Sequence, residues 1–218
     1  MKILFQGDSV TDAGRTGCNY ENLGRGYPNF VAGNLQCRYP DKGFEVVNRG
    51  IGGNRVVDLY QRWKVDALNL RPDVISILIG INDTWHEKAC HNGVEPDRFE
   101  MVYRALLQWT TKVLPDVKLV ICEPFMFKVG DAKEGYEVGQ NWAPADDWAP
   151  EMDVRRAIVK SLAEEFGATF VPFQSVLDNA LQRATANVWL GDGVHPTPAG
   201  HALIADAWIQ AAAPILGI

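Results

Sequence analysis

The sequence lacks several features that would place it in other classes of protein. None of its apolar runs approaches the roughly 20 residues of a membrane-spanning helix, and the longest, at residues 74–81, has the length of a strand. Its cysteines, Cys18, Cys37, Cys90 and Cys122, form no CxxC pair, so they indicate reduced thiols and neither a zinc nor a redox motif. Basic residues are outnumbered, 21 against 27 acidic residues, and the formal charge of -6 disfavours a nucleic-acid partner. We therefore expect no membrane and no nucleic acid among its partners.

The length of the chain and its N-terminal segment indicate the number of domains and the cellular location. The opening segment, MKILFQGDSV, has an apolar run far shorter than that of a secretory signal, which predicts a cytoplasmic protein. A chain of 218 residues with 22% charged residues is typical of one globular domain, so we expect a single domain over residues 1–218. Its core needs no metal or disulfide for stability.

Short runs rich in β-branched residues alternate with longer segments of helical period. The runs predict five strands, at residues 2–6, 44–48, 73–80, 117–124 and 168–173. The helical segments lie at residues 28–39, 56–70, 96–114, 149–166 and 199–215. Near-continuous apolar strands separated by helices indicate a parallel sheet covered on both faces, a three-layer α/β domain. Residues 126–150 stay unassigned; a segment of that length is typical of a lid or a binding loop.

Ligands of such sheets bind beyond the carboxyl ends of the strands, so the residues that follow each strand are the candidates for chemistry. Ser9 follows the first strand, and of the four serines it is the one best placed as a nucleophile, near a helix start that offers backbone donors. The competing interpretation is a Ser that only caps the helix, or an Asx turn made by Asp8.

A serine nucleophile needs a base, and the base needs a group that orients it. His195 lies in a Gly- and Pro-rich turn three residues after Asp192, an offset that can bring the carboxylate beside Nδ1 of the ring. His86 and His91 are expected in a polar loop and His201 at the start of the last helix. The alternative for Asp192 and His195 is a capping Asp beside a surface His.

The ends of the second and third strands carry candidates for stabilising an oxyanion. Gly52 and Gly53 could bring backbone amides close to a ligand, and Asn82 offers a neutral amide with two N–H donors. A phosphate-binding loop is the rival explanation of GIGGN, but the segment matches neither GxGxxG nor GxxxxGK[ST].

Together these blocks resemble the GDSL, or SGNH, hydrolase family, and in the family's order: GDSVTD, NRGIGGN, GIND and DGVH. The resemblance implies a catalytic triad of Ser9, Asp192 and His195, and an oxyanion hole built from Ser9, Gly53 and Asn82. It also implies a flavodoxin-like sheet of order 2-1-3-4-5, with no metal and no organic cofactor. Val10 stands where the family name has Leu, and no serine lies in a GxSxG elbow.

Longer segments, among them LGRGYPNFV and VVNRGIGGNRVVDLYQRW, are similar to bacterial intracellular acetylxylan esterases and related carbohydrate acetylesterases of this family. The likeness fades over residues 126–150. It implies a small ester substrate, an acetylated oligosaccharide such as an acetylated xylo-oligosaccharide. Two alternatives remain: an acyl-thioesterase or lysophospholipase with the same machinery, and a catalytically silent carbohydrate-binding domain. The oligomeric state stays open, with a homo-oligomer as one option.

The tryptophans divide into core and loop candidates. Trp63, Trp109 and Trp208 fall at helical positions and are expected in the core. Four others fall in or beside predicted loops: Trp85, Trp142, Trp148 and Trp189. Aromatic faces suit sugar rings, but a loop aromatic can equally serve to hold its loop in place. We take Trp85 and Trp189, together with Asp8, as candidate substrate-binding residues.

Overall fold

A computed structural model describes residues 1–15, 22–127 and 148–218. Its centre is a sheet of five parallel strands in the order β2-β1-β3-β4-β5, which confirms the expected topology. The strands are β1 (Lys2–Gly7), β2 (Glu45–Asn48), β3 (Val74–Leu78), β4 (Lys118–Cys122) and β5 (Thr169–Val171). Each lies within the predicted run or one residue beyond it.

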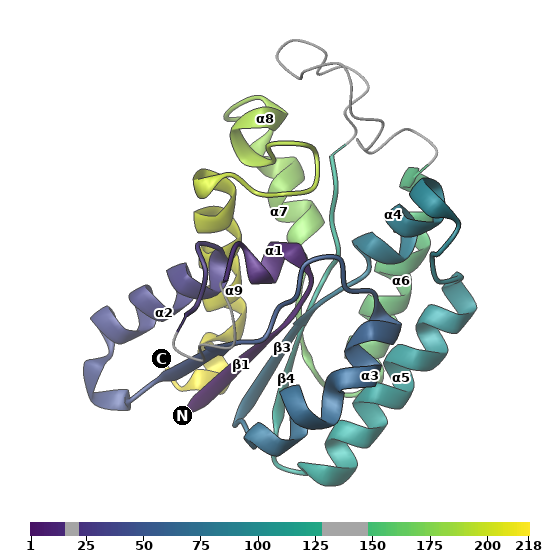
Figure 1. The fold of residues 1–218 in the computed structure, drawn as a ribbon. Helices are drawn as coiled ribbons and strands as arrows, with labels where there is room; N and C mark the ends of the chain where they lie inside the picture. The colour runs from purple at the N-terminus through teal and green to yellow at the C-terminus, as the bar shows by residue number, and fades with distance from the viewer. Residues whose placement is uncertain (16–21, 128–147) are drawn as a thin grey trace.

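The helices cover both faces of the sheet (Figure 1). The α-helices are α1 (Ser9–Asp12), α2 (Tyr27–Arg38), α3 (Val56–Asp66), α4 (Ile81–Cys90), α5 (Pro96–Val113), α6 (Ala149–Glu165), α7 (Phe173–Ala180), α8 (Ala186–Trp189) and α9 (Pro198–Leu216), with 3-10 turns at Pro40–Lys42 and Leu68–Leu70. Helices α2, α7 and α9 share one apolar cluster, and α3, α5 and α6 share the other. The sequence thus folds into the three layers that its pattern predicted.

Alternation along the strands explains the two cores. Ile3 and Phe5 pack with the α2 and α9 cluster, whereas Leu4 between them packs with the α3 and α5 cluster. All three side chains are fully buried, so a near-continuous apolar run is what this strand requires. Trp63 and Trp208 are fully buried, as expected, and each indole N–H has a partner, Thr110 Oγ1 at 2.8 Å and Ser76 Oγ at 2.9 Å respectively.

Three elements differ from the sequence-based expectation. The loop expected around His86 is the helix α4, and His91 follows its last residue. Two short helices, α7 and α8, were not predicted. Buried residues of α4 lie only in its first turn, so the helix displays no apolar period that sequence analysis could detect.

Over the described ranges, no helix is long and apolar enough to cross a membrane.

Candidate active site

The segments that directly follow β1, β2 and β3 carry three of the predicted site residues, at the start of α1, in a loop and at the start of α4 respectively. Ser9 follows β1, Gly53 follows β2 and Asn82 follows β3. Because these strands are neighbours in a parallel sheet, the three segments meet at the same edge. Asp192 and His195 belong to the segment between α8 and α9, and the contact of His195 with Ser9 places them at that edge.

Ser9, His195 and Asp192 form a continuous chain of hydrogen bonds. Ser9 Oγ lies 2.7 Å from His195 Nε2, and His195 Nδ1 lies 2.6 Å from Asp192 Oδ2. The other carboxylate oxygen, Asp192 Oδ1, accepts from the backbone N–H groups of Val194 and His195 at 2.9 and 2.7 Å. A proton on Nδ1 directed at the carboxylate leaves Nε2 able to accept the proton of Ser9.

The two ionisable residues of this hydrogen-bonded series, His195 and Asp192, shift each other's pKa. The hydrogen bond to Asp192 raises the pKa of His195 above its usual 6.5, against the opposing effect of burial. Burial alone would raise the pKa of Asp192, but its hydrogen bonds from the His195 ring and backbone outweigh that effect and lower it. The carboxylate therefore stays charged beside the ring and stabilises the imidazolium when it forms.

Ser9 is the first residue of α1, and Asp8 is the N-cap of this helix. Asp8 Oδ1 accepts from the backbone N–H of Val10 at 3.0 Å, and the residue is only 1% exposed. Burial raises the pKa of Asp8 to about 7, although the Val10 hydrogen bond and the nearby His195 act in the opposite direction. In the structure the Asp8 carboxylate serves the turn that presents Ser9, and its contact with the substrate stays a prediction.

Gly53 and Asn82 line one cavity with Ser9 and His195. The cavity measures about 380 Å³, and Trp85, His86, Ala89 and Cys90 complete its described lining. Gly53 has φ +80°, a conformation that side chains rarely adopt, so this position favours glycine. One N–H of the Asn82 side chain donates to the backbone oxygen of Asn54 at 3.1 Å, and an amide group has a second N–H to offer.

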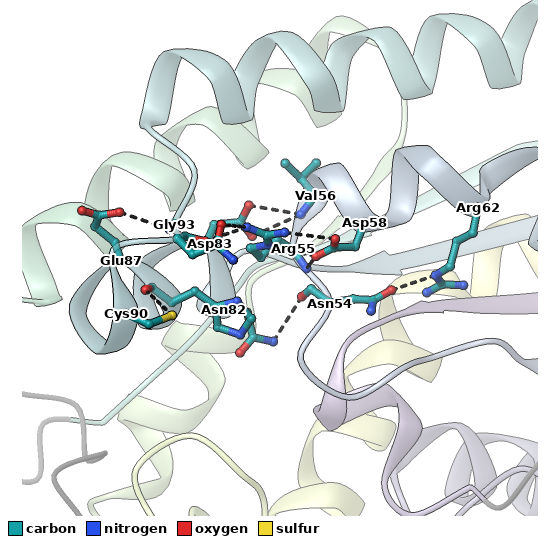
Figure 2. Close-up of polar contacts among 12 residues, drawn as sticks. Asn54, Arg55, Val56, Asp58, Arg62, Asn82, Asp83, Glu87, Cys90 and Gly93 are labelled. Carbon is teal, nitrogen blue, oxygen red and sulfur yellow. Dashed lines mark hydrogen bonds and ion pairs between the residues drawn. The ribbon is translucent and has the colours of Figure 1, made fainter.

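A polar network behind Asn82 holds the loop that carries Gly53 (Figure 2). The buried carboxylate of Asp83 accepts from the N–H of Val56, the first residue of α3, at 3.1 and 3.3 Å. Arg62 Nε donates to the Asn54 side-chain oxygen at 2.7 Å, and Arg62 Nη2 donates to the backbone oxygen of Gly7 at 3.4 Å. These bonds link the end of β1, the loop after β2 and the start of α4.

Asp83 and its surroundings were not singled out by the sequence analysis. Burial raises the pKa of Asp83 to about 7, while the nearby Arg155 guanidinium acts to lower it. Arg155 is 1% exposed and donates to Thr84 Oγ1 at 2.8 Å and to the backbone oxygen of Val94 at 2.6 Å. The only sequence signal was the Asp directly after Asn82 in GIND, a residue type that is rarely buried without a partner.

The structure separates the tryptophans expected at the site. Trp85 is half-buried, lines the cavity, and its ring centroid lies 6.0 Å from that of His195. Trp189 is 6% exposed and packs in the α2 and α9 cluster, with Arg183 over its ring at 5.1 Å. The fold thus gives the Trp189 indole a packing role, and its substrate contact stays a prediction. Trp148 is also buried, 5.5 Å from Trp85 between ring centroids, and Trp142 lies outside the described residues.

The described residues include no group of three or more His, Cys, Asp or Glu side chains that could hold a metal ion. The site is instead a Ser, His and Asp arrangement beside backbone and amide donors, which suits acyl transfer.

Similar proteins are known in sequence and in structure. The chain is 36% identical to an acetylxylan esterase of Geobacillus stearothermophilus over 96% of its length and 92% of the relative's. A solved structure of that organism's acetylxylan esterase Axe2 matches with a TM-score of 0.83 at 33% identity, covering 100% of this chain and 94% of Axe2. Two Axe2 variants, one serine-to-alanine and one aspartate-to-alanine, are described as catalytic mutants of that enzyme.

A second solved relative is a GDSL-like lipase from Parabacteroides merdae. It matches with a TM-score of 0.87 at 40% identity, over 96% of this chain and 94% of its own. The model of the GDSL-like lipase/acylhydrolase family matches residues 5–203, a range that includes Ser9, Asn82 and His195. The chain therefore belongs to the GDSL-like lipase/acylhydrolase family.

Proposed function

We propose that this chain is a serine esterase that removes acetyl groups from carbohydrate, with short acetylated xylo-oligosaccharides as the first substrates to test. The observation that carries the proposal is the chain of hydrogen bonds from Ser9 Oγ through the His195 ring to Asp192. Membership of the family supports ester hydrolysis. Similarity to an acetylxylan esterase supports the choice of the acetyl group and the sugar.

In the proposed reaction Ser9 Oγ attacks the carbonyl carbon of the ester while His195 Nε2 takes the serine proton. The tetrahedral intermediate collapses, the C–O bond to the sugar breaks, and the protonated imidazole gives its proton to the departing alcohol. Water then attacks the acyl-enzyme with the same imidazole as base, which releases acetate and restores Ser9. Asp192 holds the ring in the required tautomer and stabilises its charged form.

The oxyanion of both tetrahedral intermediates needs fixed hydrogen-bond donors. The proposed donors are the backbone N–H groups of Ser9 and Gly53 and the second side-chain N–H of Asn82. Support comes from the shared cavity of these residues and from the bond between Asn82 and Asn54, which fixes the amide plane. A donor held in place needs no reorganisation when the charge develops.

Hydrolysis of a matched panel tests the proposal: acetylated xylo-oligosaccharides, para-nitrophenyl esters of increasing acyl length, and acyl thioesters. We expect acetyl esters to give the highest kcat/KM and acetylated sugars to release acetate. A preference for medium acyl chains or thioesters would indicate the thioesterase or lysophospholipase alternative. Binding of the sugars without any hydrolysis would indicate a carbohydrate-binding domain.

A further inference from the structure

A second cavity adjoins the catalytic pair. It measures about 440 Å³ and shares Ser9 and His195 with the cavity that contains Asn82. The rest of its described lining is Val10, Ala13, Gly14, Arg25, Pro196, Pro198 and His201. None of these residues is acidic, so the described wall offers no carboxylate to a ligand.

Arg25 supplies a positive charge to this wall. Its backbone N–H donates to Ala13 at 3.0 Å, which fixes the residue against the turn after α1. The guanidinium lies across Gly14, where a Cβ atom would approach Arg25 Nη2 to 3.0 Å. In the part of the chain that the structure describes, the guanidinium has no carboxylate or carbonyl partner, and the residue is exposed.

His201 adds a neutral donor. Its Nδ1 accepts the backbone N–H of Tyr27 at 3.1 Å, so the proton of the neutral ring resides on Nε2. Burial and the nearby His195 lower the pKa of His201 to about 4, which keeps the ring neutral at pH 7. The residue is 8% exposed and lines the cavity, and among the described residues Nε2 has no hydrogen-bond partner.

We propose that this cavity binds the alcohol part of the ester, and that Arg25 and His201 select an alcohol part that bears a carboxylate. The inference rests on the proposed function, because an acetyl group is uncharged and any charge must then lie on the alcohol side. A carboxylate accepts two N–H groups from a guanidinium and can accept a third from an imidazole. The corresponding natural class is an acetylated oligosaccharide that contains a uronic acid.

Two acetate esters of the same shape test the proposal, one of para-hydroxybenzoate and one of para-hydroxybenzamide. They differ in charge at the far end of the alcohol part, and the ratio of their kcat/KM values measures selection for the anion. We expect wild type to favour the anionic ester beyond the ratio found for hydrolysis by hydroxide alone. Arg25→Gln should lower this ratio about three- to fivefold, mainly through KM, as expected for one exposed charge-assisted contact.

Arg38→Gln is the matched control, because Arg38 is exposed at the end of α2, carries the same charge, and lies outside the cavity lining. It should leave the ratio unchanged, and Arg25→Glu should lower the ratio further than Arg25→Gln. Equal ratios in wild type and Arg25→Gln, with both esters hydrolysed, would overturn this inference and leave the proposed function intact. Hydrolysis of neither ester by wild type would overturn both.

Discussion

The two cavities that share Ser9 and His195 differ in how firmly their polar groups are held. On one side, the loop after β2 and the start of α4 are tied together by Asn82, Asp83 and Arg62, with hydrogen bonds of 2.7–3.4 Å to neighbouring backbone and side-chain groups. On the other side, Arg25 lies over a glycine with its guanidinium unpartnered among the described residues.

This difference matches two chemical tasks. Stabilising a developing oxyanion requires donors that are already in position, because reorientation would cost part of the gain. Recognising the alcohol part of a substrate tolerates a longer, adaptable side chain at the surface. We therefore expect changes on the Asn82 side to alter kcat and changes on the Arg25 side to alter substrate preference.

The largest effect should follow removal of the Ser9 hydroxyl, because Ser9 lines both cavities. Ser9→Ala removes the proposed nucleophile, and only the binding and oxyanion contributions remain, so turnover should fall to within about 10³- to 10⁴-fold of the uncatalysed rate. The variant should unfold at the wild-type temperature, since Ser9 is a half-buried surface group. Steady-state kinetics, thermal unfolding and labelling of wild type by a serine-reactive organophosphonate check this. A folded Ser9→Ala variant that keeps wild-type activity contradicts the assignment.

Removal of the Asn82 side-chain donor should have the second-largest effect on turnover. Asn82→Ala should lower kcat by about 10²- to 10³-fold with little change in KM, the magnitude known for loss of one oxyanion donor. The side chain also donates to Asn54, so some loss of thermal stability is expected as well. If Asn82 only shapes the loop, the melting temperature will fall while the rate per folded molecule stays within about threefold of wild type.

Activity should depend on pH through His195. Only the neutral ring accepts the serine proton, and Asp192 raises the pKa of His195 above 6.5. The profile of kcat/KM should therefore fall on acidification, with its midpoint above 6.5. Asp192→Asn removes the charge that raises this pKa and should move the midpoint downward as well as lowering the rate. A profile that is flat from about pH 5 to 8 would argue against a histidine base.

The smallest effect should come from a change in the polar network around Arg62, behind Asn82. Arg62→Gln breaks the link from Gly7 to Asn54 and should reduce kcat several-fold, with KM nearly unchanged. Arg104→Gln is the control, because Arg104 pairs with the carboxylates of Glu100 and Glu165 at a half-buried position on α5. Equal kcat values for the two variants would assign Arg62 to stability alone.

The parts that sequence predicted well are those with a local signature. Each strand is a short apolar run, and the turn of Asp192 and His195 needs only residues three apart, so both are visible without knowledge of the fold. Asp8 and Trp189 are different, because their burial depends on what packs over them from distant segments. The hydrogen bond of Arg62 to Gly7 spans 55 positions of the sequence, and the one to Asn54 spans 8. No period or motif in the sequence predicts them.

The distance along the chain between Ser9 and His195 has a consequence for biosynthesis. The proposed nucleophile begins α1, directly after the first strand, whereas its proposed base follows 186 positions later, after the last strand. During synthesis the serine leaves the ribosome long before its base exists, and domains of this kind fold as units. Ester hydrolysis by a nascent chain thus reports that nearly the whole sheet has assembled. The time at which activity appears during synthesis therefore measures when folding is complete.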